Sequence, residues 1–191
     1  MSATNNIATL HRQALVSTRG VVAGIRPEQF GLSTPDADWD VRALLNHVVS
    51  GNLWAAELAS GKTIADVGDR LDGDVLGTDP LGAYERSARD ASAAFEAPGA
   101  LDAPCAVSYG PVPGSVYAGH RFIDVFIHGW DLAKATSQDQ SLDPELVTAC
   151  AEVLEPQLSM LQGSGMFGTA VDVPAGADPQ TRLLASLGRR V

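Results

Sequence analysis

Residues 117–135 read YAGHRFIDVFIHGWDLAKA and form the longest apolar, helix-favouring part of the sequence. Apolar side chains recur in it at helical spacing and no proline interrupts it, so it predicts one long helix over about 115–136. Asp124 and His128 are embedded among its isoleucines and phenylalanines. Four residues apart on a helix, their side chains share one face, with Cβ atoms about 5–6 Å apart. The stretch therefore predicts a core helix that also carries polar chemistry.

Working outward, the same periodicity predicts further helices on both sides of this stretch. Aspartates and a following proline supply start signals, while Gly61 and Pro98 supply stops. The predicted helices cover 6–25, 40–61, 80–97 and 143–161, with a short one over 178–187 in the tail. The polar segment 66–78 is predicted to be a loop. The proline-rich connection 98–114 is predicted to hold one extended piece near Ala106–Tyr109 and is a candidate lid.

Helices joined by loops, without a series of strands, predict an all-α fold built as an antiparallel four-helix bundle. The chain has 191 residues, which fits a single domain over 1–191. The additional helix and tail at the C-terminal end complete this predicted fold. A chain of this length buries roughly 70% of its unfolded surface, so it needs no metal or disulfide merely to fold.

Composition excludes several classes of function. The net charge is −10, with 13 Lys+Arg against 23 Asp+Glu, and no basic stripe offsets it, so nucleic-acid binding is not expected. No apolar run approaches the roughly 20 residues that span a bilayer. The first residues show no basic segment followed by an apolar core, so no export signal is expected, and Cys105 and Cys150 show no paired spacing. We therefore expect a cytoplasmic protein with two reduced, unreactive thiols.

A third residue completes a candidate metal site with Asp124 and His128. His47 lies in the middle of the helix predicted over 40–61, flanked by apolar residues, and so should point toward the core. Either histidine could instead be an ordinary core residue, and the Asp124–His128 pair could be a plain hydrogen bond. However, burying an ionised aspartate is costly unless a cation or donor compensates it. Three protein ligands also leave a coordination position open, which is typical of catalytic metal sites.

Three segments together resemble a known family: DADWDVRALLNHVVSGNLW at 36–54, FIDVFIHGWDLAKAT at 122–136 and DVPAGADPQTRLLASLGRR at 172–190. They are similar to the DinB-like superfamily, in its actinobacterial branch related to the metal-binding N-terminal domain of mycothiol-dependent maleylpyruvate isomerase. The resemblance covers nearly the whole chain. It implies a DinB-like four-helix bundle that binds a divalent metal ion through His47, Asp124 and His128. It also implies zinc first, with nickel as the alternative.

The resemblance further implies a metal-dependent transferase or isomerase that acts on a small electrophilic substrate. A metal-bound thiolate, with mycothiol as co-substrate, or a metal-bound water would be the nucleophile. The isomerase itself carries Glu in place of Asp124 and has a C-terminal α/β domain that we do not expect here, so activity on maleylpyruvate does not follow. Two alternatives stay open: a non-catalytic stress protein that binds metal or small molecules, and a biosynthetic lyase, cyclase or hydrolase. The oligomeric state also stays open, with a homodimer among the options.

Other residues are assigned from their place along the predicted helices. The candidate catalytic residues are His120, Arg121 and Tyr117. His120 is a fourth ligand, an acid–base group or a surface residue. Arg121 and Tyr117 are candidates for clamping a carboxylate, with pairing to an acid of the protein as the alternative for Arg121. Asp131, three residues after His128, is expected to orient that histidine. The tryptophans are assigned to packing, with Trp130 the first choice as pocket wall, and His11 is assigned to the surface.

Overall fold

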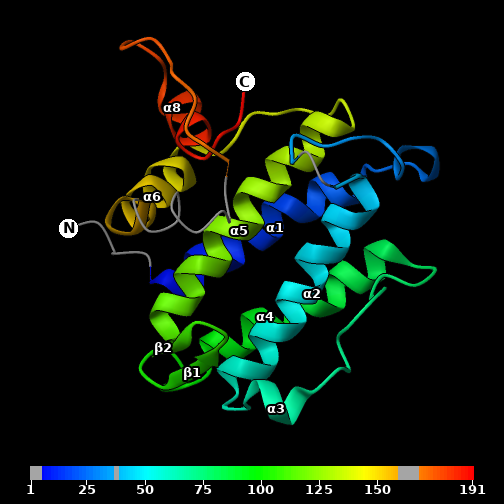
Figure 1. The fold of residues 1–191 in the computed structure, drawn as a ribbon, viewed down its shortest axis with the longest axis vertical. Coiled ribbons are helices and arrows are strands. Elements are labelled where there is room, and N and C mark those ends of the chain that lie inside the picture. Colours follow the sequence, from blue (N-terminus) through cyan, green and yellow to red (C-terminus); the bar gives the residue numbers. More distant parts are fainter. Residues whose placement is uncertain (1–5, 37–38, 159–167) are drawn as a thin grey trace.

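The computed structural model describes residues 6–36, 39–158 and 168–191. Within these ranges it contains seven α-helices and one small antiparallel sheet, which confirms the predicted DinB-like, mostly helical fold class (Figure 1). The bundle consists of α1 (Ile7–Ala23), α2 (Val41–Ala59), α4 (Pro80–Glu96) and α5 (Gly114–Ala135). No helix in the described ranges is long and apolar enough to cross a membrane.

Local sequence explains where the helices begin. Asn6 and Asp40 precede α1 and α2, and each side chain accepts a hydrogen bond from a first-turn amide. Asp79 does the same for α4, with Pro80 at the first helical position, where its missing N–H is not needed. These caps satisfy amides that have no partner inside the helix, and the predicted helix starts are therefore confirmed within a residue or two.

In chain order, α1 runs up the bundle, α2 and α4 both run down, and α5 runs up again (Figure 1). Arg12 pairs with Glu96 and Arg19 with Glu85, so α1 and α4 are antiparallel, as α2 and α5 are. In contrast, α1 and α5 run parallel, and so do α2 and α4 (Figure 1). The predicted antiparallel packing therefore holds for two of the four neighbouring pairs. The reason is the crossover 60–79, which contains the short helix α3 (Ile64–Val67) and returns the chain to the end where α2 began.

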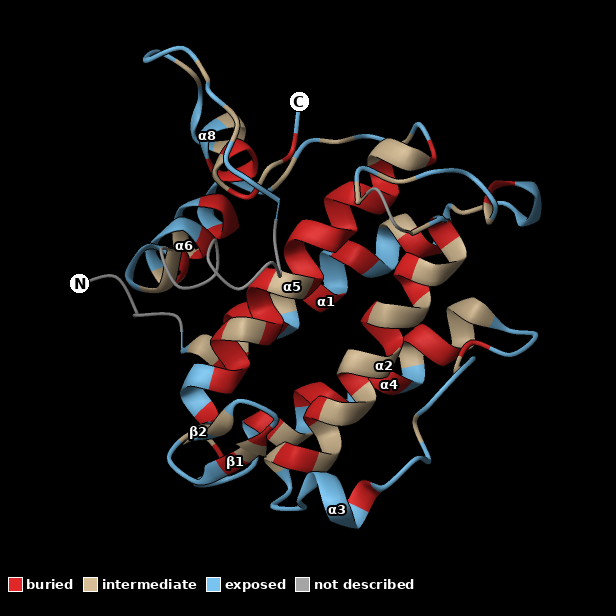
Figure 2. Ribbon diagram, viewed as in Figure 1, coloured by how far each residue is buried: buried red, intermediate tan, exposed pale blue. Residues whose placement is uncertain are grey.

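The helix α5 occupies the centre of the protein and is buried on nearly every side (Figure 2). On its outer side lie α6 (Pro144–Leu154) and α8 (Pro179–Ser186), which pack against each other. Its contact with α1 is close, because a Cβ at Gly129 would lie 2.3 Å from the hydroxyl oxygen of Thr18. Because α5 is surrounded by other helices, a polar side chain on it has to find its hydrogen-bond partners on those helices.

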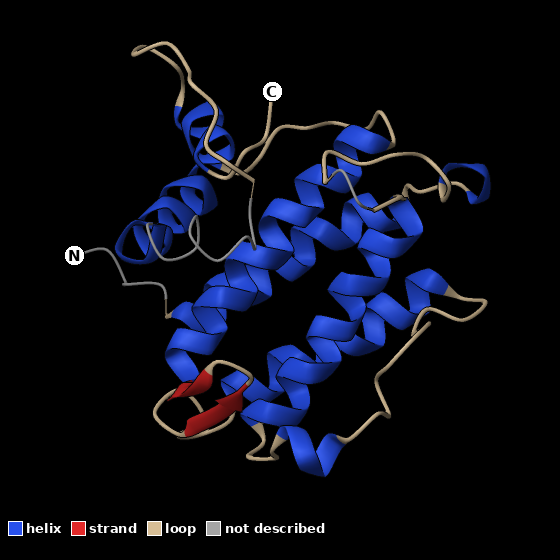
Figure 3. Cartoon of the chain, in the orientation of Figure 1, coloured by secondary structure: helices blue, strands red, loops and turns tan. Residues whose placement is uncertain are grey.

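The connection 98–114 forms a hairpin rather than a single extended piece. The strands β1 (Pro104–Val107) and β2 (Gly110–Pro113) pair at one end of the bundle (Figure 3). Gly110 has φ +113°, a conformation that favours glycine. The helix expected over 143–161 ends earlier, at Leu154, and a 3-10 turn covers Glu155–Gln157. The last residues of that prediction, 159–161, lie outside the described residues.

Candidate metal centre

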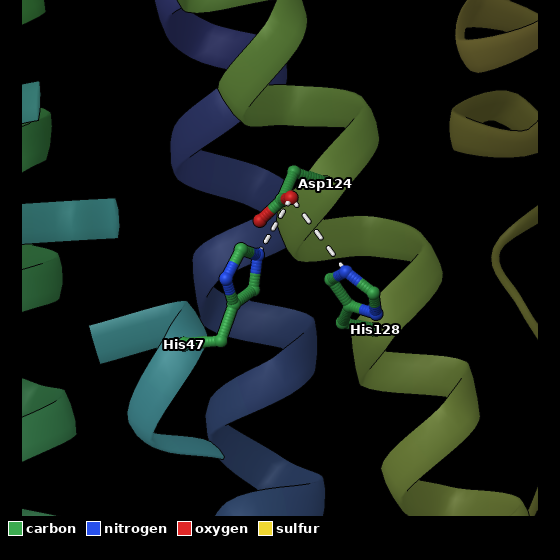
Figure 4. A group of neighbouring side chains, drawn as sticks. All are labelled: His47, Asp124 and His128. Carbon is green, nitrogen blue, oxygen red and sulfur yellow. Dashed lines mark hydrogen bonds and ion pairs between the residues drawn. The ribbon is translucent and has the colours of Figure 1, made fainter. Parts of the chain in front are cut away.

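The three predicted ligands converge between α2 and α5. The Nε2 atom of His47 lies 3.1 Å from Oδ1 of Asp124, and Nε2 of His128 lies 3.6 Å from the same oxygen. Figure 4 shows both imidazoles turned toward this carboxylate. His47 comes from α2, whereas Asp124 and His128 come from α5. One donor atom from each residue lies within 4.8 Å of the others, and in the described part of the chain this is the one cluster of its kind.

This arrangement fits a divalent cation. Zinc binds histidine nitrogen and carboxylate oxygen at about 2.0–2.1 Å in tetrahedral geometry, which places neighbouring ligand atoms about 3.4 Å apart. The separations from Asp124 to His47 and to His128 bracket that value. Two nitrogens and one oxygen also suit zinc and nickel better than magnesium or calcium, which prefer oxygen ligands. The donor set therefore fits zinc or nickel, the two metals that the family resemblance implies.

The second oxygen of Asp124 is held by Arg121. The guanidinium Nη1 lies 2.9 Å from Oδ2, and both side chains are largely buried. Burial alone would raise the carboxyl pKa, but Arg121, then His128 and His47, hold the pKa of Asp124 well below its usual range. The guanidinium occupies the space beside Gly51, where a Cβ would lie 2.3 Å from Nη1. Arg121 therefore holds Asp124 ionised rather than standing free to clamp a substrate carboxylate.

A buried carboxylate orients His128, as the spacing of Asp131 predicted. Oδ2 of Asp131 lies 3.0 Å from Nδ1 of His128. Nδ1–H donating to this carboxylate leaves the lone pair of Nε2 directed at the metal position. Asp131 in turn contacts Arg189 through both of its oxygens. Arg189 was not among the predicted site residues, because no local pattern links two residues that are 58 positions apart.

The other two catalytic candidates lie elsewhere. His120 is bound at both ring nitrogens, by the hydroxyl of Tyr109 at 2.5 Å and by Oε1 of Gln157 at 2.6 Å. It is not part of the three-residue cluster. Tyr117 packs edge-on against Phe95 in a hydrophobic cluster, and burial raises the pKa of its hydroxyl to about 12. Roles for both residues in catalysis therefore remain predictions, without a contact to the cluster to support them.

A tryptophan lies beside the cluster, but it is Trp39 and not the predicted Trp130. The ring of Trp39 lies 4.6 Å from that of His47 and 6.0 Å from that of His128. Trp130 is instead 1% exposed, so its assignment as pocket wall was wrong. An open groove of about 400 Å³ adjoins His47 and includes Trp39 and Trp54 in its lining. This volume is within the range of small-molecule sites.

His11 corrects another prediction, because it is fully buried in α1 rather than at the surface. Neither of its ring nitrogens has a hydrogen-bond partner within the described residues. Burial, and then the positive charge of Arg121, lower the pKa of His11 to about 3, although Asp124 acts in the opposite direction. The imidazole is therefore neutral and packs edge-on against Phe95.

Comparison with known proteins assigns this chain to a family. The model of the mycothiol maleylpyruvate isomerase N-terminal domain matches residues 11–133. The chain belongs to this family. The matched range contains all three candidate ligands together with Arg121 and Asp131. It ends before α6 and α8, so the part of the chain that carries Arg189 lies beyond the residues that define the mycothiol maleylpyruvate isomerase N-terminal domain.

Two relatives extend the similarity along the whole chain. The uncharacterized proteins Rv0738 and MT0763, from two strains of Mycobacterium tuberculosis, are each 34% identical over 186 residues, which is 95% of this chain and 96% of the relative. The similarity to these two relatives therefore extends beyond residues 11–133 into the part of the chain that holds α6 and α8.

Solved structures confirm the fold of this family member. A crystal structure of the mycothiol-dependent maleylpyruvate isomerase aligns with a TM-score of 0.63 at 16% sequence identity, covering 83% of this chain and 71% of that one. A structure of a histidine-to-alanine mutant of the isomerase aligns with a TM-score of 0.64 over the same shares. At this identity the likeness establishes the bundle, and the chemistry must be argued from the residues.

Proposed function

We propose that the chain is a metal-dependent enzyme that activates a low-molecular-weight thiol for attack on a small electrophile. The observation that carries this proposal is the convergence of His47, Asp124 and His128 on one position beside an open groove. Zinc is the first metal to test and nickel the second. We further propose that the protein acts in the cytoplasm. Mycothiol is the first thiol to test, because the solved structures that share this fold are of a mycothiol-dependent isomerase.

The charges of the site support an anionic ligand at the open position. The two imidazoles are neutral when they ligate through Nε2, and the single negative charge of Asp124 is already balanced by Arg121. The charge of a bound cation would therefore stay largely uncompensated, which favours a thiolate over a neutral ligand. A divalent cation in this position lowers the pKa of a thiol placed against it and so supplies a nucleophile near neutral pH.

The protein residues hold and orient the reactants. Asp131 keeps the proton on Nδ1 of His128, and Arg121 keeps the carboxylate of Asp124 ionised. His47 is the most exposed of the three ligands, with 36% of its side chain accessible, so the thiol and the substrate would approach along the groove on its side. The ring of Trp39 packs beside both imidazoles there and helps to hold them in place.

The two reactions under this proposal differ in what happens to the thiol. In both, the thiol proton is released to solvent and the sulfur forms a C–S bond with an electrophilic alkene carbon, while the C=C π bond opens and its electron pair moves onto the conjugated carbonyl. In an isomerisation the electron pair returns, the C=C bond re-forms and the C–S bond breaks, and the thiolate takes a proton back, so thiol is not consumed. In a transfer the neighbouring carbon takes a proton from solvent instead and the C–S bond remains in the product, so thiol falls in step with substrate. Free thiol measured during turnover of an electrophile panel distinguishes them.

Cobalt(II) substitution tests thiol activation directly. Thiolate ligation to cobalt(II) gives a near-ultraviolet charge-transfer band that nitrogen and oxygen ligands do not give. We expect mycothiol to produce this band at neutral pH in the cobalt protein. His47→Ala, which removes one ligand, is expected to abolish it. A cobalt protein that binds the metal but shows no band with mycothiol or a simpler thiol contradicts the thiol chemistry.

A further inference from the structure

The C-terminal tail places a buried arginine behind the metal centre. Arg189 is 4% exposed. Its Nη2 and Nε donate to the two oxygens of Asp131 at 2.8 and 3.2 Å. The chain turns inward at Gly188, whose φ of +83° favours glycine and where a Cβ would lie 2.7 Å from the backbone of Gly168. The backbone is thus built to bring this side chain inside.

The contact continues to a metal ligand and to a second segment. Asp131 is fully buried and accepts from Nδ1 of His128 at 3.0 Å. Arg189 also donates from Nη2 to Oδ2 of Asp36 at 3.3 Å, in the segment that leads into α2 and therefore toward His47. One guanidinium thus connects the tail to α5 and to the segment that precedes α2.

We propose that Arg189 is a positioning residue of the metal centre, which holds His128 in its metal-binding orientation through Asp131. The inference rests on the proposed metal site and extends it to the tail. A carboxylate with no solvent access needs compensation. His128 provides one hydrogen bond, and the two-pronged contact from Arg189 provides the charge. Without Arg189, Asp131 would lose the two hydrogen bonds that fix its carboxylate, which could then turn away from Nδ1 of His128.

The proposal predicts a specific pattern of zinc affinities. Loss of a group that orients a metal ligand typically weakens metal binding 10- to 100-fold. We expect Arg189→Gln to weaken zinc binding by about tenfold, measured by competition with a chromophoric chelator. Arg189→Lys keeps the charge but not the planar two-pronged contact, so we expect an intermediate affinity. Arg190→Gln is the matched control, because its side chain is exposed and the charge change is the same, and its zinc affinity should equal that of the parent protein.

A double variant separates positioning from stability. Arg189→Gln leaves a buried carboxylate without its charge partner, so it should also lower the melting temperature of the apo-protein. Asp131→Asn combined with Arg189→Gln removes both charges and should recover part of that stability. The zinc affinity of the double variant should stay low, since the carboxylate that orients His128 is absent. If its affinity returns to the parent value along with stability, Arg189 is only structural and the proposal is wrong.

Tail docking gives a second readout, because coupling between two sites is reciprocal. The amide of Arg189 donates to the carbonyl of Leu184 at 3.0 Å, so its hydrogen exchange reports on the turn after α8 that carries the buried Arg189 side chain. Zinc should slow this exchange in the parent protein and slow it less in Arg189→Gln. If the parent binds no zinc, the proposed metal site itself fails. If the parent and Arg189→Gln bind zinc equally, the metal site stands and the role of Arg189 is refuted.

Discussion

The buried histidine of α1 gives a prediction whose magnitude follows from the structure. Burial lowers the pKa of His11 to about 3 in the native state, against 6.5 for an ordinary histidine. Because the native pKa is the lower one, the contribution to stability is complete above pH 6.5 and decreases as the pH falls toward 3. At pH 5 the unfolded chain is stabilised by protonation of this residue by about 2 kcal/mol, while the native state gains almost nothing.

Denaturant titrations at two pH values measure this effect. In the presence of a chelator, the unfolding free energy of the parent protein should fall between pH 7 and pH 5 by about 2 kcal/mol more than that of His11→Leu. Other titrating groups contribute equally to both proteins and cancel in the comparison. His11→Gln is the control, because it also lacks the titration but keeps a buried polar group. It should match His11→Leu in pH dependence and be less stable at pH 7.

The reasoning fails if the parent protein and His11→Leu lose the same unfolding free energy between the two pH values. That result would mean that His11 takes up its proton in the native state at an ordinary pKa. It would therefore place the residue in contact with water, contrary to its full burial.

Three shorter predictions follow from the packing. Gly129→Ala should lower the unfolding free energy by about 1–3 kcal/mol, because the added Cβ overpacks the α1–α5 contact. Gly20→Ala has open space around it and should raise the unfolding free energy by about 0.5–1 kcal/mol. Denaturant titration measures both changes. Asp124→Asn should weaken metal binding, because Asn keeps the shape of the ligand and removes its charge. It should also cost about 1–3 kcal/mol of unfolding free energy, since a buried guanidinium loses its anionic partner; elemental analysis and melting measure the two effects. Cys105 and Cys150 are buried with raised pKa values, so a thiol reagent should modify them only after denaturation.

Local patterns in the sequence predicted the helices and the three ligands. Capping aspartates and prolines act within one turn, so they locate helix starts without knowledge of the fold. The spacing of Asp124 and His128 acts in the same local way. His47 required one further step, because only the burial of its helix face indicates that it meets the other two. This is why most of the candidate site was available from the sequence.

Features that depend on distant contacts were not predicted. The direction of α4 depends on the path of the crossover 60–79. The residues of this crossover do not show whether it crosses the length of the bundle or turns back at once. Arg189 meets Asp131 only because the tail folds back onto α5. In contrast, the burial of His11 had a local signal: it lies four residues after Ile7 and four before Leu15, in the apolar stripe of α1. Helical spacing should have outweighed its polarity.

Metal content of the purified protein tests the central claim most directly. Elemental analysis after dialysis against zinc should give about one ion per chain for the parent protein. His47→Ala and His128→Ala should lose it, while His120→Ala should retain it, because both ring nitrogens of His120 are already bound by Tyr109 and Gln157. A parent protein without stoichiometric metal, or full metal content in the variant that lacks both His47 and His128, would contradict the account.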